Sequence, residues 1–512
     1  MPCRIYLQST VANSSSFIAK RLIGGKGSRL SRPIVTIAMI AIALGVALMI
    51  VALSVLRGFQ EEIKQKLIGF GAHIQVVSSD DNFSKESVRM RHDMNLVQSL
   101  DSLAGVQHVQ RFALMPGILE SESIEGVVVK GVTDDFSWKF FDDKLVEGKL
   151  LNDTSLHSNQ YIIISKTLAS RLSVELNDKI TLYLVRSKED IKPRTFRIAG
   201  LFQTGLDEFD RKFVLVDMDH IQRTQGWGLE AQIRIDTTCA SGYTAEGLAF
   251  GGDGNFDYHW TDSSWFGPGP HAICPKDGER IELIVSDQSE TFTDTAKVKF
   301  NIAFAEGCCS KVNYELSTSG GSYLKYTGGY EIFVDDFDKL EEMDEKIYHN
   351  IPFFTQTRTV KDLNPEIFNW LEMLDLNVYI IIGLMVFISV INMTSALLII
   401  ILERTQMIGL LKAMGATDGN ILEIFLRNAG YIVGLGLLLG NVLGIGVCVI
   451  QAQTGFISLD PTTYFVDQAP ILIEPMYIIL LDVFTLVVCL LFLILPGMYV
   501  SRISPIKAIR FD

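Results

Sequence analysis

The segment ERTQMIGLLKAMGATDG, residues 403–419, is a short charged stretch between two long apolar runs, and the rest of the chain is interpreted outward from it. Met407, Leu410, Leu411 and Met414 recur at spacings of three and four, which predicts a helix with one apolar side. Gly415 follows where that helix would end. A connection of this length cannot form a domain. We expect it to lie against a membrane and to present a surface to a partner protein.

Four apolar runs are long enough to cross a bilayer, which requires about 20 residues. They cover residues 34–56, 378–402, 426–449 and 477–499. The chain is 48% hydrophobic, and the excess is concentrated in these runs, which indicates a membrane protein. The third run carries glycines at GxxxG spacing, which allows close helix packing. We favour packing within the chain's own bundle over a dimer seam.

The basic residues predict the orientation of the chain in the membrane. Residues 1–33 contain six basic residues and no acidic one, whereas the 450–476 connection contains acidic residues and neither Lys nor Arg. Both termini are therefore expected in the cytoplasm and residues 57–376 outside it. That external part contains 33 basic and 51 acidic residues, a net charge of −18. An acidic external domain argues against nucleic acid as a partner.

The N-terminal region predicts an amphipathic helix on the inner leaflet, because Phe17, Ile18 and Leu22 oppose Lys20 and Arg21. The following GGKGS lacks the spacing of a phosphate loop. No other stretch has that spacing and no hydrolytic constellation stands out, so we predict a chain without its own ATPase site. The first apolar run is too long for a cleavable signal peptide and has no cleavage site behind it.

The helical pattern continues past the first span to residue 68, and Pro365 starts a matching one before the second span. These two stalks flank an external α+β domain. Its predicted strands cover residues 73–77, 126–132, 161–165, 179–185, 195–202, 213–216 and 231–235, and its helices residues 94–103, 166–172 and 337–348.

Residues 237–326 differ in composition, being rich in Gly, Ser, Thr and aromatic residues, and loosely resemble a PKD- or immunoglobulin-like β-sandwich. We interpret them as an inserted module. Four of the seven cysteines fall here, and in an extracytoplasmic domain they are disulfide candidates with three possible pairings: Cys239, Cys274, Cys308 and Cys309. A partial calcium-loop pattern and two histidines occur here as well, but polar turns explain them better, so we predict no metal site.

One span, a large external domain and then three spans is an order that resembles the FtsX/MacB-type ABC transporter permease family. The 403–417 segment is similar to that family's coupling helix, although Met407 stands where a Glu is usual. ISKTLASRL at 164–172 resembles its external-domain signature, and PIKAIR at 505–510 its C-terminal ending. Residues 17–28, 330–342 and 459–475 look most like the lipoprotein-releasing permeases LolC and LolE.

This resemblance implies a membrane subunit that works with a cytoplasmic ABC ATPase, which binds the ATP and Mg²⁺, and with a second permease copy or homologue. It further implies a bacterial inner-membrane location, a lipoprotein substrate and a periplasmic carrier. The residues it assigns to ATPase coupling are Glu403, Arg404, Ile408, Leu411, Lys412, Gly415 and Ala416. The outer ends of the first two spans are candidates to line a cleft for acyl chains or simply to face lipid and their neighbours: Met49, Leu53, Leu56, Val378, Tyr379 and Ile382. A carrier-docking hairpin would contain Arg186, Pro193 and Arg194.

The alternatives to lipoprotein release are a MacB-like efflux pump, an adhesion-type sensor and an FtsX-like activator of cell-wall hydrolases.

The expected division of the chain into segments follows from these assignments. The segments are residues 1–33, N-terminal amphipathic helix; 34–69, first span and stalk; 70–236, external domain; 237–326, insert; 327–363, external domain; 364–402, stalk and second span; 403–425, coupling loop; 426–499, third and fourth spans; and 500–512, tail.

Overall fold

The computed structural model describes residues 31–501 except 84, 154–155, 157–159, 186–190, 239–241, 253, 274–277, 288–291, 302–312, 319–320, 461–463 and 465. The chain divides into two compact units, residues 1–64 with 366–512, and residues 65–365. The predicted N-terminal amphipathic helix and the C-terminal PIKAIR motif lie outside the described residues.

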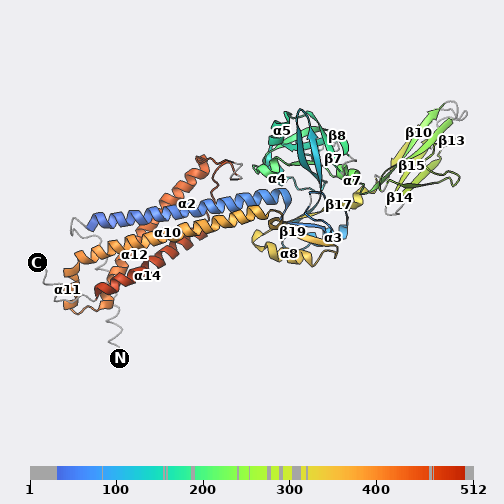
Figure 1. Ribbon diagram of the computed structural model, residues 1–512. Helices are drawn as coiled ribbons and strands as arrows, with labels where there is room; N and C mark the ends of the chain where they lie inside the picture. Colours follow the sequence, from blue (N-terminus) through green and yellow to red (C-terminus); the bar gives the residue numbers. More distant parts are fainter. Residues whose placement is uncertain are drawn as a thin grey trace. The chain divides into compact units, whose positions relative to one another are not determined.

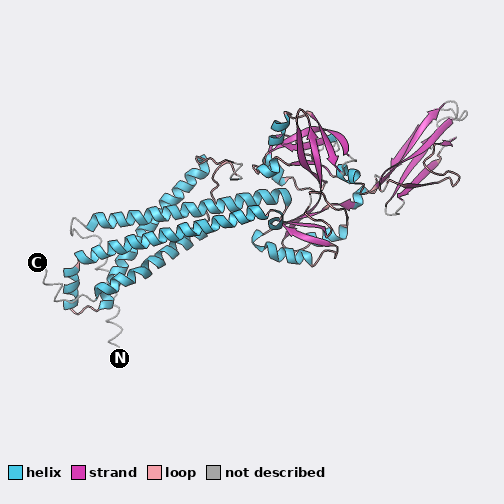
Figure 2. Cartoon of the chain, viewed as in Figure 1, coloured by secondary structure: helices cyan, strands magenta, loops and turns pink. Residues whose placement is uncertain are grey.

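The first unit is helical (Figures 1 and 2). Its long helices are α2 (Ser31–Gly71), α10 (Pro365–Glu403), α12 (Asp418–Thr454) and α14 (Pro475–Ser501), and the short α11 (Thr405–Ala413) follows α10. Within the described residues, four helices are long and apolar enough to cross a membrane. As predicted, α2 continues unbroken past its apolar run, and Pro365 is the first residue of α10.

The glycines of α12 pack inside this unit against α2. A Cβ at Gly440 would lie 2.7 Å from Val46 Cβ, and one at Gly444 would lie 3.1 Å from Ala47 Cα. Side chains at these positions would push the two helices apart, because the contacts are to backbone and to branched carbons. The preferred prediction of packing within the bundle is confirmed for these glycines.

The second unit is built on a closed ring of six strands. In ring order they are β3 (Val106–Glu120), β4 (Ile124–Val132), β9 (Phe213–Asp217), β6 (Tyr161–Ser165), β8 (Ile191–Phe202) and β7 (Lys179–Val185), which pairs back to β3. Its interior is a cluster of buried aliphatic side chains that includes Val129, Ile164 and Leu182. Helix α5 (Lys166–Leu172) follows β6, and the Ser165 hydroxyl caps it by accepting from Leu168 N at 2.9 Å.

The N-terminal half of β3 also joins a second sheet, in the order β19 (Thr355–Thr359), β1 (Ile74–Ser78), β18 (Gly329–Val334) and β3. Helices α3 (Met94–Asp101) and α8 (Leu340–Tyr348) accompany it. The chain enters this sheet through β1, directly after α2, and leaves it through β19, shortly before α10. Ile74 pairs with Thr359, so the strands adjoining the two long helices are neighbours.

The insert is a two-sheet β-sandwich. One sheet contains β10 (Leu229–Thr238), β11 (Gly242–Gly251) and β13 (His271–Ile273). The other contains β12 (Phe256–Trp260), β14 (Arg280–Asp287), β15 (Thr293–Asn301) and β16 (Asn313–Thr318). At the root, Ser322 N donates to Leu229 O at 3.0 Å and Leu229 N donates to Ser322 Oγ at 2.8 Å, so the chain enters and leaves at adjacent positions. The module begins eight residues before the predicted 237, because β10 is continuous from Leu229.

Most predicted strands and helices of the external domain occur, several with shifted ends. Sequence reasoning missed β3, β18 and β19 and three shorter strands, Met90–Arg91, Leu145–Gly148 and Tyr326–Thr327. β3 belongs to both sheets and β19 lies at a sheet edge, whereas β18 is buried along almost its whole length, so none of these three shows a simple alternation of buried and exposed positions.

Candidate functional site

The short helix α11 lies between two helices that are long enough to span a membrane. Helix α10 ends at Glu403, and Arg404 N still donates a hydrogen bond to Ile400 O at 3.2 Å before α11 starts at Thr405. After α11, Gly415 adopts a φ of +96°, a conformation that favours glycine. The Thr417 hydroxyl then caps α12 by accepting from Asn420 N. Local chemistry in the sequence therefore explains the end of α11 and the start of α12.

The exposed side of α11 differs from the predicted one. Ile408 is 1% exposed and belongs to the helical core, so its side chain anchors α11 and offers no surface. Leu410 and Met414, one turn apart, are 58% and 69% exposed. Sequence reasoning had grouped these two with the half-buried Met407 and Leu411 on one apolar side. In the structure only Leu410 and Met414 of these four are exposed, whereas Met407 and Leu411 are half-buried.

The polar residues assigned to coupling are partly engaged within the unit. Lys412 Nζ lies 2.7 Å from an Asp418 carboxylate oxygen, and this ion pair ties the end of α11 to the start of α12. Glu403 and Gly415 are exposed, whereas Arg404, Leu411 and Ala416 are half-buried. The exposed members of this group lie on the same segment as the exposed Leu410 and Met414, and the coupling role of all of them stays a prediction.

The predicted cleft residues differ in exposure. Met49 is completely buried and Leu56 is 4% exposed, so for these two side chains the structure shows the alternative, contact with neighbouring residues. The cleft itself stays a prediction. Leu53, Val378 and Ile382 are half-buried, and Tyr379 is 59% exposed.

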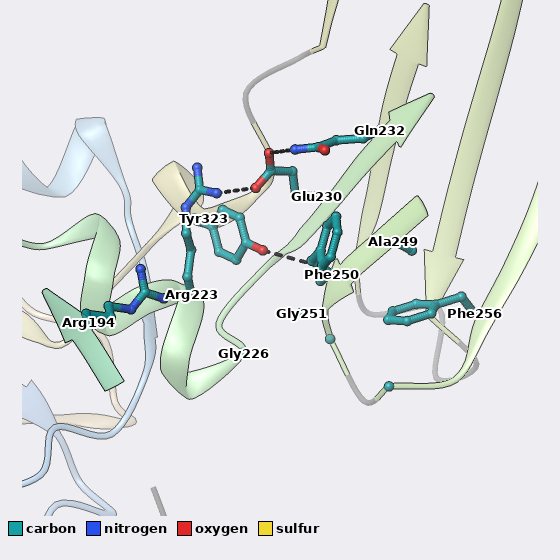
Figure 3. A pocket seen from close by; sticks show the side chains of 12 residues that line it. Arg194, Arg223, Gly226, Glu230, Gln232, Ala249, Phe250, Gly251, Phe256 and Tyr323 are labelled. Atoms are coloured by element: carbon teal, nitrogen blue, oxygen red, sulfur yellow. Dashed lines mark hydrogen bonds and ion pairs between the residues drawn. The ribbon is translucent and has the colours of Figure 1, made fainter. Parts of the chain in front are cut away.

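The predicted docking hairpin exists as the antiparallel pair β7 and β8, with Val185 opposite Ile191. Arg186 lies outside the described residues. Pro193 is exposed. Arg194 turns inward: a guanidinium nitrogen lies 2.9 Å from His220 Nδ1, and the side chain lines a pocket (Figure 3). Burial lowers the pKa of Arg194.

That pocket, of about 620 Å³, lies between the six-stranded ring and the root of the sandwich (Figure 3). Arg223 pairs with Glu230 across it, and the Tyr323 hydroxyl donates to Phe250 O at 3.2 Å. Burial raises the pKa of Tyr323 to about 12. The predicted docking residue Arg194 therefore lines the pocket at the joint between the six-stranded ring and the insert, a location that sequence spacing could not reveal.

All four disulfide candidates, Cys239, Cys274, Cys308 and Cys309, lie outside the described residues, so their pairing stays a prediction. Among the described residues, no group of three His, Cys, Asp or Glu side chains is arranged to hold a metal ion.

A buried charge network at the end of α2 was not predicted. Lys130 Nζ donates to Glu331 Oε1 at 2.7 Å and to Phe70 O at 2.5 Å, and the two side chains are 2% and 1% exposed. Gln75 and Gln110 also donate to Glu331. The sequence contained one signal: Lys130 interrupts the apolar run GVVVKGV of a predicted strand. Such a lysine requires a buried partner.

Two sequence profiles of known families match the chain. That of the MacB-like periplasmic core domain matches residues 35–249, and that of the FtsX-like permease C-terminal region matches residues 379–505. The chain belongs to the FtsX/MacB-type family of ABC transporter permeases. Neither profile covers residues 250–378 of this permease, which contain strands β12 to β16 of the sandwich.

Individual relatives of the permease are distant. The lipoprotein-releasing system transmembrane protein LolC of Neisseria meningitidis is 20% identical over 498 residues, 94% of each chain. LolC of Xylella fastidiosa is 29% identical over 195 residues, which are 36% of this chain and 44% of that relative. The uncharacterized ABC transporter permease YknZ of Bacillus subtilis is 28% identical over 133 residues, 26% and 30% of the two chains.

Proposed function

We propose that this chain is the membrane subunit of an ATP-driven transporter that extracts lipoproteins from a bacterial inner membrane and delivers them to a periplasmic carrier. The observation that carries the proposal is the similarity to a lipoprotein-releasing protein over 94% of both chains. A local resemblance would support only a shared domain, whereas this one includes the spans, the external unit and the connection that contains α11. Because the two sequences are only 20% identical, the identity of the substrate is the part of the proposal that experiment must test.

The ATPase partner is inferred from α11. A helix of nine residues between two apolar helices, with Leu410 and Met414 exposed and Glu403 and Arg404 at its start, suits a groove on a soluble protein. With both termini in the cytoplasm, this surface faces the compartment that contains ATP. The chain supplies no phosphate loop among its motifs, so the ATP and Mg²⁺ are bound by the partner.

A second permease copy or a homologue would complete the path for acyl chains. Tyr379 is exposed and Leu53, Val378 and Ile382 are half-buried, unlike the buried Met49 and Leu56. Apolar side chains that a single copy leaves accessible can contact lipid or line a lateral opening between two copies. A lipid-modified substrate needs such an opening, because exposing its acyl chains to water is energetically unfavourable.

Depletion of the protein followed by membrane fractionation tests the substrate. We expect lipoproteins destined for the outer membrane to accumulate in the inner membrane. Normal lipoprotein distribution in depleted cells would reject lipoprotein release. Increased sensitivity to exported compounds would then favour a MacB-like efflux pump, and a defect limited to cell-wall hydrolysis would favour an FtsX-like activator.

A separate experiment tests the partner. Leu410→Asp and Met414→Asp each place a charge on the exposed side of α11 without disturbing its core contact at Ile408. We expect either change to abolish co-purification of the ATPase while membrane insertion is unchanged. Phe353→Asp is the matched control, because Phe353 is fully exposed in the external unit. Retained co-purification in both α11 variants would reject the coupling surface.

A further inference from the structure

A carboxyl group lies inside a predicted membrane span, where it meets a carboxamide from another helix. Asp482 lies on α14, seven residues after Pro475, or about 10 Å along the helix. Asn441 lies within α12. Asn441 Nδ2 donates to Asp482 Oδ2 at 2.6 Å. Ionisable residues within a membrane span are costly to bury, so they are rare unless they serve a function.

Two oxygens of this pair and a third, one helical turn along α14, are buried and have no hydrogen-bond partner within the described part of the chain. They are Asp482 Oδ1, Asn441 Oδ1 and Thr485 Oγ1. Thr485 follows Asp482 by one helical turn and is completely buried. Two of these oxygens belong to the same carboxyl and carboxamide groups that already share one hydrogen bond. An ionised carboxylate and a carboxamide oxygen can only accept, so neither can satisfy the other.

No positive charge compensates Asp482 among the described residues. Its one hydrogen-bond partner is Asn441, and it forms no ion pair. Near the outer end of the unit, Arg57 lies over the ring of Tyr477 and Gln60 donates to Asp375. The one basic side chain on α12 and α14 is Arg427, which pairs with Glu423 at 2.5 Å and lies 14 residues before Asn441.

We propose that Asp482 and Asn441 form a proton-binding site within the membrane. A proton on Asp482 Oδ1 removes the charge and turns this oxygen into a donor. Asn441 Oδ1 and Thr485 Oγ1 are the acceptors that the structure offers to it. Carboxylic acid and carboxamide are complementary, since each has one donor and one acceptor side. One proton therefore satisfies oxygens on both helices and neutralises a charge that hydrocarbon disfavours.

The protonated pair ties α12 to α14, and loss of the proton leaves a negative charge between them. The folded state then binds a proton that an unfolded chain exposed to water at neutral pH does not bind. The stability of the helical unit should therefore decrease as pH rises through the titration of this site. Proton binding is a property of the chain itself and does not depend on which substrate the transporter moves.

The full-length protein in native membranes can be probed with dicyclohexylcarbodiimide, an apolar reagent that modifies protonated carboxyl groups. Mass spectrometry of the peptide containing both Glu474 and Asp482 provides an internal control, because Glu474 precedes α14. We expect modification of Asp482 and little of Glu474 at neutral pH. Above its midpoint, modification should fall about tenfold per pH unit. Replacing choline chloride by sodium chloride should not change it.

Two results would overturn the proposal. Protection of Asp482 by sodium would identify a sodium site. Absence of modification, together with identical protonated-carboxyl infrared bands in the wild type and Asp482→Asn, would show an ionised, hydrated carboxylate. Asp482→Asn keeps the size and neutrality of the protonated acid, so it should insert normally. The thermal midpoint of the wild type in detergent should decrease as pH rises from about 4, where an unfolded aspartate titrates, to the midpoint of this site, and Asp482→Asn should lack this decrease. An unchanged pH profile in the variant would also contradict the proposal.

Discussion

The base of the external unit and the inserted sandwich differ in where they keep their ion pairs. At the base, Lys130 and Glu331 are buried and joined to the last turn of α2. In the sandwich, the ion pairs Lys297–Glu282 and Arg234–Glu246 lie at the surface, and the buried carboxylates of Asp287 and Asp294 accept hydrogen bonds from the backbone nitrogens of Phe292 and Ala231. Buried pairs require a fixed geometry on all sides, whereas surface pairs tolerate change. The base is thus built to hold one arrangement of strands around the helix end, and the sandwich is a self-contained module.

Lys130→Met should have the largest effect. It leaves Glu331 buried without its cation and removes the donor to Phe70 O. We expect a loss of about 3–5 kcal/mol of stability, measured by denaturant unfolding of the purified protein. Lys130→Met with Glu331→Leu removes both charges and should recover part of the loss. A loss below about 1 kcal/mol for the single change would show that the buried pair at the base contributes no more to stability than a surface pair of the sandwich.

The next effect concerns pH at the base. Burial lowers the pKa of His73 to about 4 from 6.5, and its Nδ1 accepts from Val334 N at 3.2 Å, so the folded state holds it neutral. The unfolded chain binds the proton first. Stability is therefore complete above pH 6.5 and is lost as pH falls towards 4, by about 3 kcal/mol in total. The thermal midpoint of the wild type should decrease as pH falls from 6.5 to 4, and this decrease should be smaller in His73→Gln. An equally steep profile in the variant would assign it to other groups.

Tyr323→Phe tests the joint between the two regions. It removes the hydrogen bond to Phe250 O but keeps the ring, so we expect a loss of about 1 kcal/mol. Limited proteolysis near the root of the sandwich should accelerate accordingly. Equal protease sensitivity in wild type and variant would indicate that this hydrogen bond does not hold the joint.

Lys297→Met should have the smallest effect. Lys297 and Glu282 face each other across β14 and β15, 3.0 Å apart, with 55% and 39% of their side chains exposed. Water and salt screen such a pair, so the change should cost less than about 1 kcal/mol, and the cost should vanish in high salt. A loss as large as that of Lys130→Met would remove the distinction between the two regions.

The sequence by itself determined the elements whose signals are local. Apolar length predicted the four spans, Ser165 predicted the start of α5, and Gly415 the end of α11. It also indicated a separate module at about residue 237 through composition. These predictions succeed because spans, caps and left-handed glycines depend on a few consecutive residues and on the solvent they meet.

Only the tertiary structure decided which side chains are accessible. It buried Ile408, Met49 and Leu56, placed Arg194 in the pocket at the root of the sandwich, and joined Lys130 to Glu331, 201 positions away. The same holds for Asp482 and Asn441, whose chemistry depends on two helices meeting at one depth. Burial and charge pairing are properties of distant segments brought together, and no local pattern of residues contains that information.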